Sequence, residues 1–184
     1  PQLLDVEALN KNAAEGRFEV TKMSFAAYAY VSDKYQILNA GSALGRGCGP
    51  LIISKNPLAL DDLKDKTIAI PGARTTANLL MSIFVPACQG KIEMVFSAIE
   101  DAVLSGLCDA GLIIHENRFT YQHKGLLKVA DLGELWEQKT GLPIPLGCIA
   151  VKRDLLEAEK QRIDMLIHQS VTYAFEHPTE SKEY

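Results

Sequence analysis

At positions 67–77 the chain reads Thr67-Ile68-Ala69-Ile70-Pro71-Gly72-Ala73-Arg74-Thr75-Thr76-Ala77, an apolar run followed by a glycine turn and two hydroxyl residues. The apolar residues that come next recur at helical spacing: Leu79, Leu80, Ile83 and Phe84. The segment is therefore expected to form a strand over Thr67–Ile70, to turn at Gly72, and to open a helix after the threonines. Strand–turn–helix units of this kind build α/β proteins.

Short apolar runs alternate with helical periodicity along most of the chain. Such alternation is typical of βαβ units, so the sequence predicts an α/β fold on a mainly parallel sheet. Several of the predicted strands are continuous apolar runs, for example Cys148–Val151, as expected of strands that are covered on both faces. The predicted strands are Val20–Met23, Leu51–Ser54, Thr67–Ile70, Glu93–Phe96, Ala110–Ile114, Lys128–Asp131 and Cys148–Val151.

Three further helices are predicted before the last one, and one of them contains Trp136. The first follows Ser24 over Phe25–Tyr35. The second is short: Ser97 and Glu100 have the spacing of a capping box, and Gly106 supplies the stop. The buried face of this short helix is expected to consist of Ile99, Ala102 and Val103.

The last helix has the strongest periodicity. Asp154 and Glu157 repeat the cap spacing, Pro178 terminates the helix, and a polar tail is expected over Thr179–Tyr184. The apolar face is predicted from residues that recur at helical period: Ile163, Leu166, Ile167, Val171, Ala174 and Phe175.

The composition is that of an ordinary globular protein, with 47% hydrophobic and 23% charged residues in a chain of 184. It excludes collagen, coiled coil and disorder. The longest unbroken apolar run, Phe25–Val31, is far shorter than the ~20 residues of a bilayer span, so no membrane span is predicted. The net charge is −4 and the basic residues are scattered, which argues against nucleic acid as a partner.

The four cysteines, Cys48, Cys88, Cys108 and Cys148, lie far apart in the sequence and form no CxxC pair. No metal site and no redox dithiol is therefore expected, and a reducing cytoplasm is the simplest location. The segment Pro1–Arg17 carries three acids and no apolar core, so it does not resemble a secretory signal.

Thr75, Thr76 and Ala77 open the helix that follows the first quoted strand. A helix start presents free amides and the positive end of the helix dipole, and the hydroxyls add hydrogen-bonding groups, so an anionic ligand such as a carboxylate or phosphate fits here. The alternative is that one threonine simply caps the helix. Capping needs a single hydroxyl, and the presence of two favours the anion site.

Asp109-Ala110-Gly111-Leu112-Ile113-Ile114-His115-Glu116 places an imidazole at the carboxyl end of a buried strand, where open α/β sheets bind ligands. His115 is therefore a candidate general base. The alternative is a strand-end histidine that hydrogen-bonds a neighbouring loop. No role is assigned to the remaining histidines: His123, His168 and His177.

Two loops remain open to more than one interpretation. The glycine-rich segment 41–50 is followed by a strand, which excludes a dinucleotide fingerprint or a P-loop and leaves either a connection or a ligand-contacting loop. The segment 140–147 is apolar and contains two prolines, so it is either a crossover between two lobes or a buried loop.

Several motifs taken together resemble the 1,4-dihydroxy-6-naphthoate synthase family of the futalosine route to menaquinone. They occur in the family's order and are Thr21–Ser24, Gly45–Leu51, Pro71–Ala77, Gly111–Glu116 and Thr140–Gly147. The resemblance implies a type II periplasmic-binding-protein-like fold, with two α/β lobes around a cleft and crossings near Lys55–Asn56 and Pro145–Gly147. Lobe one would comprise 1–54 and 148–184 and be incomplete, and lobe two would comprise 55–147.

The resemblance also implies a lyase reaction that needs no metal and no organic cofactor. The family's substrate, cyclic dehypoxanthine futalosine, is a small carboxylate. The family's catalytic base corresponds to His115. Thr75, Thr76 and Ala77 would bind the carboxylate or hydroxyl groups, with Ser24 and Ile114 on the opposite wall. A homodimer is left open. The family's Ser-Pro-Cys-Pro-Asn-Asp segment does not occur in this sequence, so residues 1–184 alone are expected to be inactive.

Two alternatives to this function are weighed. The sister chorismate dehydratase acts in the same pathway, although the His-Glu motif separates the two families. The same fold also serves as a non-catalytic carboxylate-binding domain, either a solute receptor or an effector-sensing module, because fold alone does not establish an activity.

Overall fold

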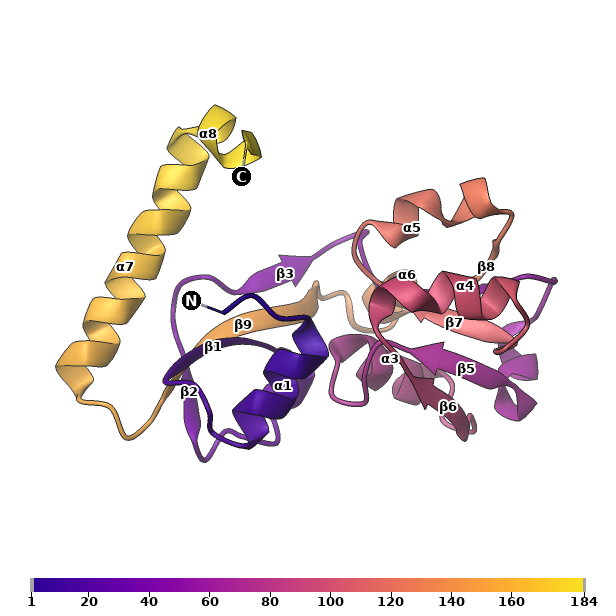
Figure 1. The fold of residues 1–184 in the computed structure, drawn as a ribbon, viewed down its shortest axis with the longest axis horizontal. Coiled ribbons are helices and arrows are strands. Elements are labelled where there is room, and N and C mark those ends of the chain that lie inside the picture. Colours follow the sequence, from indigo (N-terminus) through magenta and orange to yellow (C-terminus); the bar gives the residue numbers. More distant parts are fainter. Residues whose placement is uncertain (1, 184) are drawn as a thin grey trace.

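A computed structural model describes residues 2–183. Its strands form two sheets that lie side by side along the long axis of the molecule (Figure 1). In the four-stranded sheet the long strand β9 (Ile144–Lys152) pairs with all three others, which are β1 (Val20–Ser24), β2 (Tyr35–Ile37) and β3 (Ala43–Gly45). The five-stranded sheet has the order β6 (Gly90–Glu93), β5 (Thr67–Ile70), β7 (Ala110–Ile113), β4 (Leu51–Ser54) and β8 (Leu127–Asp131). The α/β class is confirmed.

The prediction of a mainly parallel sheet is wrong. All three pairings of β9 are antiparallel, as are the pairings of β4 with β7 and β8. Only β5 is paired in parallel, with β6 and with β7. An apolar run indicates that a strand is covered on both faces. Because this burial does not depend on the direction of the neighbouring strand, an apolar run does not predict a parallel sheet.

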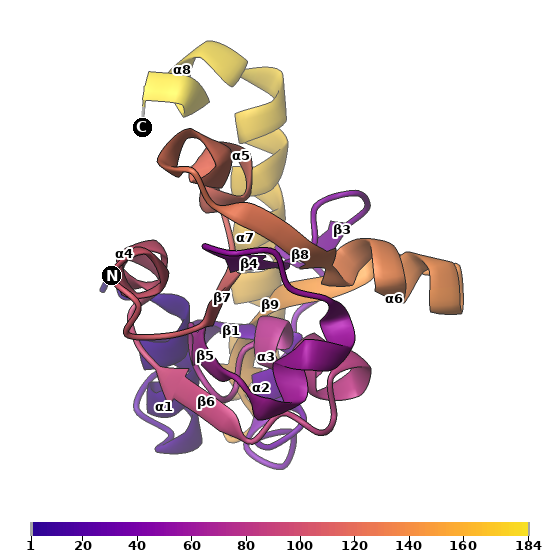
Figure 2. The ribbon, with the colours of Figure 1, turned by 90° about the vertical axis from the view of Figure 1, so that its right-hand side faces the viewer.

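Helices cover both faces of the five-stranded sheet, which explains the apolar runs. Alternate residues of one strand point to opposite faces. Ile52 thus packs with the buried side of α3 (Thr76–Phe84) and α6 (Leu132–Thr140). Leu51 and Ile53 pack with α4 (Ile99–Leu104) on the other face. Figure 2 shows the same sheet from its end, with β4 and β8 above β7 and β5.

One strand prediction needs correction. The predicted strand Glu93–Phe96 lies too late, because β6 ends at Glu93 and a 3₁₀ turn occupies Phe96–Ala98. β6 is an edge strand without a buried residue, so its apolar signal is weak, whereas Met94 just beyond it packs against the core. The strand Leu51–Ser54 was predicted correctly, and it pairs with β7 and β8 in the five-stranded sheet. The lobe boundaries themselves stay a prediction.

The predicted helix Phe25–Tyr35 is also wrong beyond its first turn. α2 covers only Phe25–Tyr28, and turns lead from it into β2. Tyr35 begins that strand and is fully buried, and its hydroxyl donates to the carbonyl of Phe18. The apolar run therefore reports burial around a bend and not one continuous helix.

The short helix α4 begins differently from the prediction. Ile99, Ala102 and Val103 are buried as expected, and Gly106 has the expected left-handed φ of 79°. The capping box is wrong, however, because the N-cap residue Ala98 makes no side-chain cap bond. The Glu100 carboxylate is turned away, and it accepts hydrogen bonds from Asn117 of α5 (Asn117–Thr120) and Lys124 of a 3₁₀ turn (Tyr121–Lys124).

Helix α7 spans Glu157–Glu176 and stands apart at one end of the molecule (Figure 1). The residue before the helix is Leu156, and its N–H donates to the Glu159 carboxylate. The predicted cap formed by Asp154 and Glu157 is therefore wrong. Pro178 starts a second short helix, α8 (Pro178–Glu183), where a polar tail was predicted. No helix within residues 2–183 is both long enough and apolar enough to cross a membrane.

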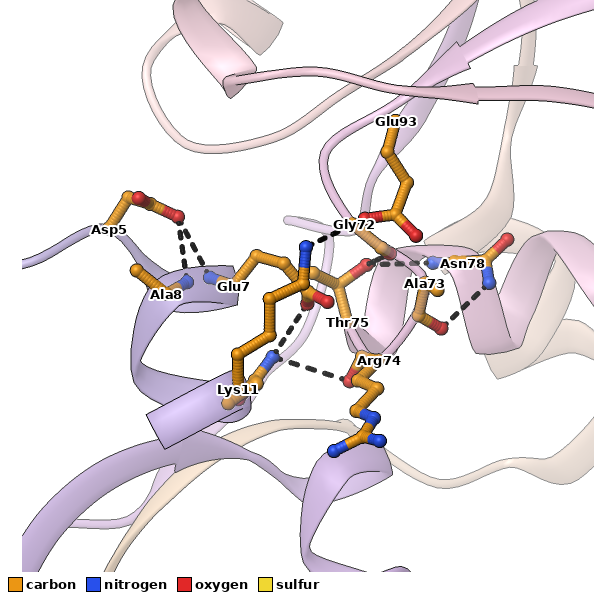
Figure 3. A network of polar contacts seen from close by, with 11 residues as sticks. Asp5, Glu7, Ala8, Lys11, Gly72, Ala73, Arg74, Thr75, Asn78 and Glu93 are labelled. Carbon is orange, nitrogen blue, oxygen red and sulfur yellow. Dashed lines mark hydrogen bonds and ion pairs between the residues drawn. The ribbon is translucent and has the colours of Figure 1, made fainter. Parts of the chain in front are cut away.

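The remaining helices complete the layers. α1 (Val6–Ala14) packs on β1 and is capped by Asp5, whose carboxylate accepts from the Glu7 and Ala8 amides (Figure 3). A 3₁₀ helix over Leu60–Asp65 precedes β5 and buries Leu63. The core of the four-stranded sheet combines α1 and α2 with β1 and β9, and includes Ala13, Met23, Ala27, Tyr35, Cys148 and Ala150.

Candidate functional site

A cavity of about 320 Å³ brings together residues from both halves of the sequence. All six site residues predicted from the sequence line it: Ser24, Thr75, Thr76, Ala77, Ile114 and His115. The other lining residues are Val6, Cys48, Gly49, Pro50, Arg118, Phe119 and Leu146. The lining is predominantly apolar, and a few polar groups converge on it, which is the usual arrangement of a small-molecule site.

The start of α3 forms one wall. The Thr75 hydroxyl accepts from the Asn78 N–H at 3.2 Å and donates to the Gly72 carbonyl at 2.8 Å, so Thr75 does cap the helix (Figure 3). The Thr76 hydroxyl donates to the Leu146 carbonyl at 3.0 Å, which ties α3 to β9. The amides of Thr76 and Ala77 belong to the first helical turn, where an amide has no acceptor within the helix. Anion-binding capacity therefore lies in these amides more than in the hydroxyl hydrogens.

Ser24 lies at the end of β1 and is almost completely buried. Its amide donates to the Asn10 side-chain oxygen at 2.9 Å, and its hydroxyl oxygen lies 3.3 Å from the Asn10 side-chain nitrogen. The hydroxyl hydrogen of Ser24 makes no hydrogen bond to the described residues, so it is available to a ligand.

His115 follows the end of β7 by two residues and is exposed. Within residues 2–183 it is the one non-glycine residue with a positive φ, at 57°. Such a conformation is uncommon for a side-chain-bearing residue, and backbone strain of this kind concentrates at functional sites. The Phe96 ring packs edge-on against the imidazole at 5.3 Å between centroids.

Arg118 is a cavity residue that sequence reasoning missed. Its Nη2 lies 2.8 Å from the Asp131 carboxylate, its Nη1 donates to the Gly49 carbonyl, and both side chains of the ion pair are largely buried. Asp131 in turn caps α6 by accepting from the Gly133 and Glu134 amides. The available sequence signal was weak, because Arg118 and Asp131 are separated by a whole strand.

The glycine-rich segment 41–50 contains β3 and then reaches the cavity at Cys48, Gly49 and Pro50. Gly49 is required by close approach of two backbones: a Cβ there would lie 2.3 Å from the Cα of Gly133. The predicted loop 140–147 divides at Ile144, where β9 begins. Ile144 lies in the core of the five-stranded sheet, and Cys148 lies in the core of the four-stranded one.

The other reactive side chains lie away from the cavity, apart from exposed Cys48. Burial raises the pKa of the Cys88, Cys108 and Cys148 thiols, to about 11 for Cys148. His177 stacks on Tyr173 in the last turn of α7, and neither His123 nor His168 lines the cavity. No cluster of three metal-binding side chains occurs among the described residues.

Comparison with known proteins identifies the family. A family model described as menaquinone biosynthesis matches residues 2–184. The chain belongs to this family. The resemblance inferred from the motifs is thereby confirmed. The chain is 48% identical to 1,4-dihydroxy-6-naphthoate synthase of Thermus thermophilus, over 100% of the chain and 66% of that protein. It is 44% identical to the enzyme of the same name from Streptomyces coelicolor, over 98% of the chain and 65% of that protein.

Solved structures show the fold. Protein AF1704 from Archaeoglobus fulgidus superposes with a TM-score of 0.91 at 41% identity, over 100% of this chain and 68% of that one. A substrate-binding protein of an amino acid ABC transporter superposes with a TM-score of 0.65 at 15% identity, over 96% of this chain and 75% of that one, which shows the fold alone. The periplasmic-binding-protein-like fold is therefore confirmed. The chain spans about two thirds of the length of the two curated relatives.

Proposed function

We propose that this chain carries the active site of a 1,4-dihydroxy-6-naphthoate synthase, a lyase of menaquinone biosynthesis. The observation that carries the proposal is the convergence of six residues, predicted from separate sequence motifs, on one cavity. The two curated relatives at 48% and 44% identity bear the name of this enzyme. The substrate is cyclic dehypoxanthine futalosine, which is split into 1,4-dihydroxy-6-naphthoate and a small keto sugar fragment.

His115 serves as the general base. A ring nitrogen takes the proton of a substrate hydroxyl, a carbonyl forms where the hydroxyl stood, and the C–C bond at that carbon breaks as in a retro-aldol reaction. The electron pair of the broken bond stays on the departing carbon, which then takes up the proton from the imidazolium. Support comes from the left-handed backbone and from the edge-on contact with Phe96, because both hold the imidazole at the cavity.

The first turn of α3 binds the substrate carboxylate. The amides of Thr76 and Ala77 and the positive end of the helix dipole favour an anion at this point of the wall. Ser24 supplies a hydroxyl donor from the facing wall, and Ile114 packs beside the base. Fixing the carboxylate end holds the reacting carbon near His115, which lowers the entropic part of the barrier.

Two coarser features belong to the same proposal. We assign the four-stranded sheet to lobe one and the five-stranded sheet to lobe two, with β9 as one of the two connections. We also assign the protein to the cytoplasm, in keeping with four unpaired cysteines. A homodimer remains a prediction from the sequence.

The decisive experiment incubates the full-length protein with cyclic dehypoxanthine futalosine and follows 1,4-dihydroxy-6-naphthoate by its absorbance after chromatography. We expect product from the parent protein and at most traces from a His115→Asn variant. Turnover of chorismate instead would assign the protein to the sister dehydratase. Tight binding of the substrate without product would assign it to the receptors or sensors of the same fold.

A further inference from the structure

Asn10 is a fully buried amide that lies between the two walls of the cavity without lining it. It belongs to α1, and its side-chain nitrogen lies 3.3 Å from the Ser24 hydroxyl and 3.4 Å from the Arg74 carbonyl. Its side-chain oxygen accepts from the Ser24 amide at 2.9 Å. One side chain thus contacts both the end of β1 and the residue that precedes the cap of α3.

The contacts of Asn10 connect the two sheets. Ser24 ends a strand of the four-stranded sheet, whereas Arg74 lies in the loop between β5 and α3 of the five-stranded sheet. Arg74 is followed immediately by Thr75 and by the two first-turn amides of Thr76 and Ala77. A change at Asn10 would therefore alter the separation between the Ser24 hydroxyl and those amides, which are the polar groups of the two walls.

Glu7 holds the Asn10 amide in this orientation. Its Oε2 accepts from the Asn10 nitrogen at 3.1 Å, and the residue is only 6% exposed. The Glu7 side chain lies against Gly72, where an added Cβ would approach to within 2.4 Å, so the loop before α3 is fitted around it (Figure 3). An amide nitrogen has two hydrogens, so the three acceptors around Asn10 share them, and Glu7 is the nearest of the three.

We propose that Asn10 is a positioning residue for substrate binding, which sets the distance between Ser24 and the start of α3, and that Glu7 orients its amide. The inference rests on the proposed function, because it names what holds the carboxylate-binding end of that site in place. Asn10 acts through Ser24 and the α3 amides and does not itself touch substrate.

The neighbouring residue provides a matched control. Lys11 lies on the same helix and also reaches the five-stranded sheet, through an ion pair of 3.1 Å with Glu93 of β6. Both side chains of that pair are exposed, and neither residue lines the cavity. Lys11→Ala therefore weakens the attachment of α1 to the other sheet while leaving the two cavity walls untouched.

The test measures steady-state kinetics of the full-length protein on cyclic dehypoxanthine futalosine for the parent and for Asn10→Asp, Asn10→Ala and Lys11→Ala. Asn10→Asp keeps the acceptor for the Ser24 amide and removes the donor to the Arg74 carbonyl. We expect KM to rise about ten-fold or more in both Asn10 variants, with a smaller fall in kcat, because misplacement of positioning groups alone reduces catalysis by up to ~10²-fold. Lys11→Ala should change both constants by less than about two-fold, since exposed ion pairs contribute little.

A second readout separates positioning from a general loss of structure. The product 1,4-dihydroxy-6-naphthoate and its 6-carboxamide analogue are compared as competitive inhibitors. The parent protein should bind the carboxylate inhibitor more tightly than the carboxamide. The Asn10 variants should lose most of this difference in inhibition constant while still binding both inhibitors through their aromatic rings.

The outcomes distinguish the two proposals. An active parent whose Asn10 variants keep the parent KM and carboxylate preference would overturn the role of Asn10 and leave the proposed function intact. Unfolding of both Asn10 variants, monitored by thermal denaturation, would assign Asn10 to the fold and also overturn its positioning role. A parent that forms no naphthoate would overturn the proposed function, and this inference with it.

Discussion

His115 shows how a single residue is presented by strain. Its positive φ turns the chain sharply after β7, so the ring projects beside the cavity instead of continuing the strand direction. The next residues then form α5, in which the Arg118 amide donates to the His115 carbonyl at 3.4 Å. The imidazole is thus placed by a bend that the surrounding helix and the Phe96 ring both maintain.

A substitution at His115 must respect that bend. Asparagine tolerates the left-handed region better than alanine does, so His115→Asn removes the base with little added strain. We expect kcat of the full-length protein to fall by about 10²–10⁴-fold, with KM and the thermal midpoint close to those of the parent. His115→Ala should lose a similar factor in kcat and, in addition, some stability. Turnover of His115→Asn near the parent value would remove His115 from the mechanism.

The cysteines offer a second prediction at the residue scale. Cys48 is exposed in the cavity wall, whereas burial raises the pKa of the Cys148 thiol to about 11, so little thiolate forms there at neutral pH. Iodoacetamide at pH 7.5 should therefore modify Cys48 first, as located by peptide mass mapping, and saturating product should slow the reaction. Faster labelling of Cys148 would contradict the burial described for β9.

At the scale of elements, the contact of Gly49 with Gly133 joins the loop after β3 to the start of α6. The two backbones approach so closely that neither residue has room for a side chain. The ion pair of Arg118 with Asp131 closes the same corner, since Arg118 also donates to the Gly49 carbonyl. One side of the cavity is therefore built on backbone packing and a buried charge pair.

Because of this close packing, substitutions at two glycines of one loop are expected to change the free energy of unfolding by very different amounts. Gly49→Ala should lower the free energy of unfolding by about 1–3 kcal/mol, because an added methyl group forces the backbones apart. Gly47→Asn is the matched control: an added Cβ meets nothing within 4 Å, and asparagine accepts the left-handed φ of 62°. Chemical denaturation of the full-length variants measures both. Equal losses at the two positions would contradict the close packing at Gly49.

The buried carboxyl of Glu7 affects the molecule as a whole, because it lies where α1 meets the loop before α3. Burial raises the pKa of Glu7 above its ordinary value of 4.5. Folding therefore favours the protonated form of Glu7. The contribution of Glu7 to the free energy of unfolding is present at low pH and is lost as the pH rises through the raised pKa. Glu7→Gln should thus gain thermal stability relative to the parent as the pH is raised from about 4 to 7. A difference that stays constant with pH would contradict this assignment.

Much of the site was predictable from sequence, because each of its main groups lies where a strand ends or a helix begins. Thr75 and His115 are examples, since the carboxyl ends of strands and the amino ends of helices are recognisable in one dimension. Arg118 and Asn10 were not predictable, because their significance comes from partners on other elements: Gly49 and Asp131 for Arg118, Ser24 and Arg74 for Asn10. Their neighbours in sequence give no indication of these contacts.

For the fold, too, features recorded in the local sequence were predictable and features set by distant contacts were not. The strands with continuous apolar runs, such as Leu51–Ser54, were located correctly, because burial on both faces is recorded residue by residue. Strand direction depends on how distant segments meet, and the antiparallel pairing of β4 with β7 and β8 could not be inferred from a run of three apolar residues. The exposed face of α7, where Leu166 is 52% and Phe175 is 82% exposed, shows that helical periodicity alone does not establish what a face packs against.

The hydrogen bond from Thr76 to the Leu146 carbonyl joins the start of α3 to the strand β9. β9 begins in the core of one sheet and ends in the core of the other. A rotation of one sheet against the other is therefore expected to strain the hydrogen bond between Thr76 and Leu146. The carboxylate that we propose at the start of α3 would lie next to this contact, so its binding is expected to be coupled to the angle between the two sheets.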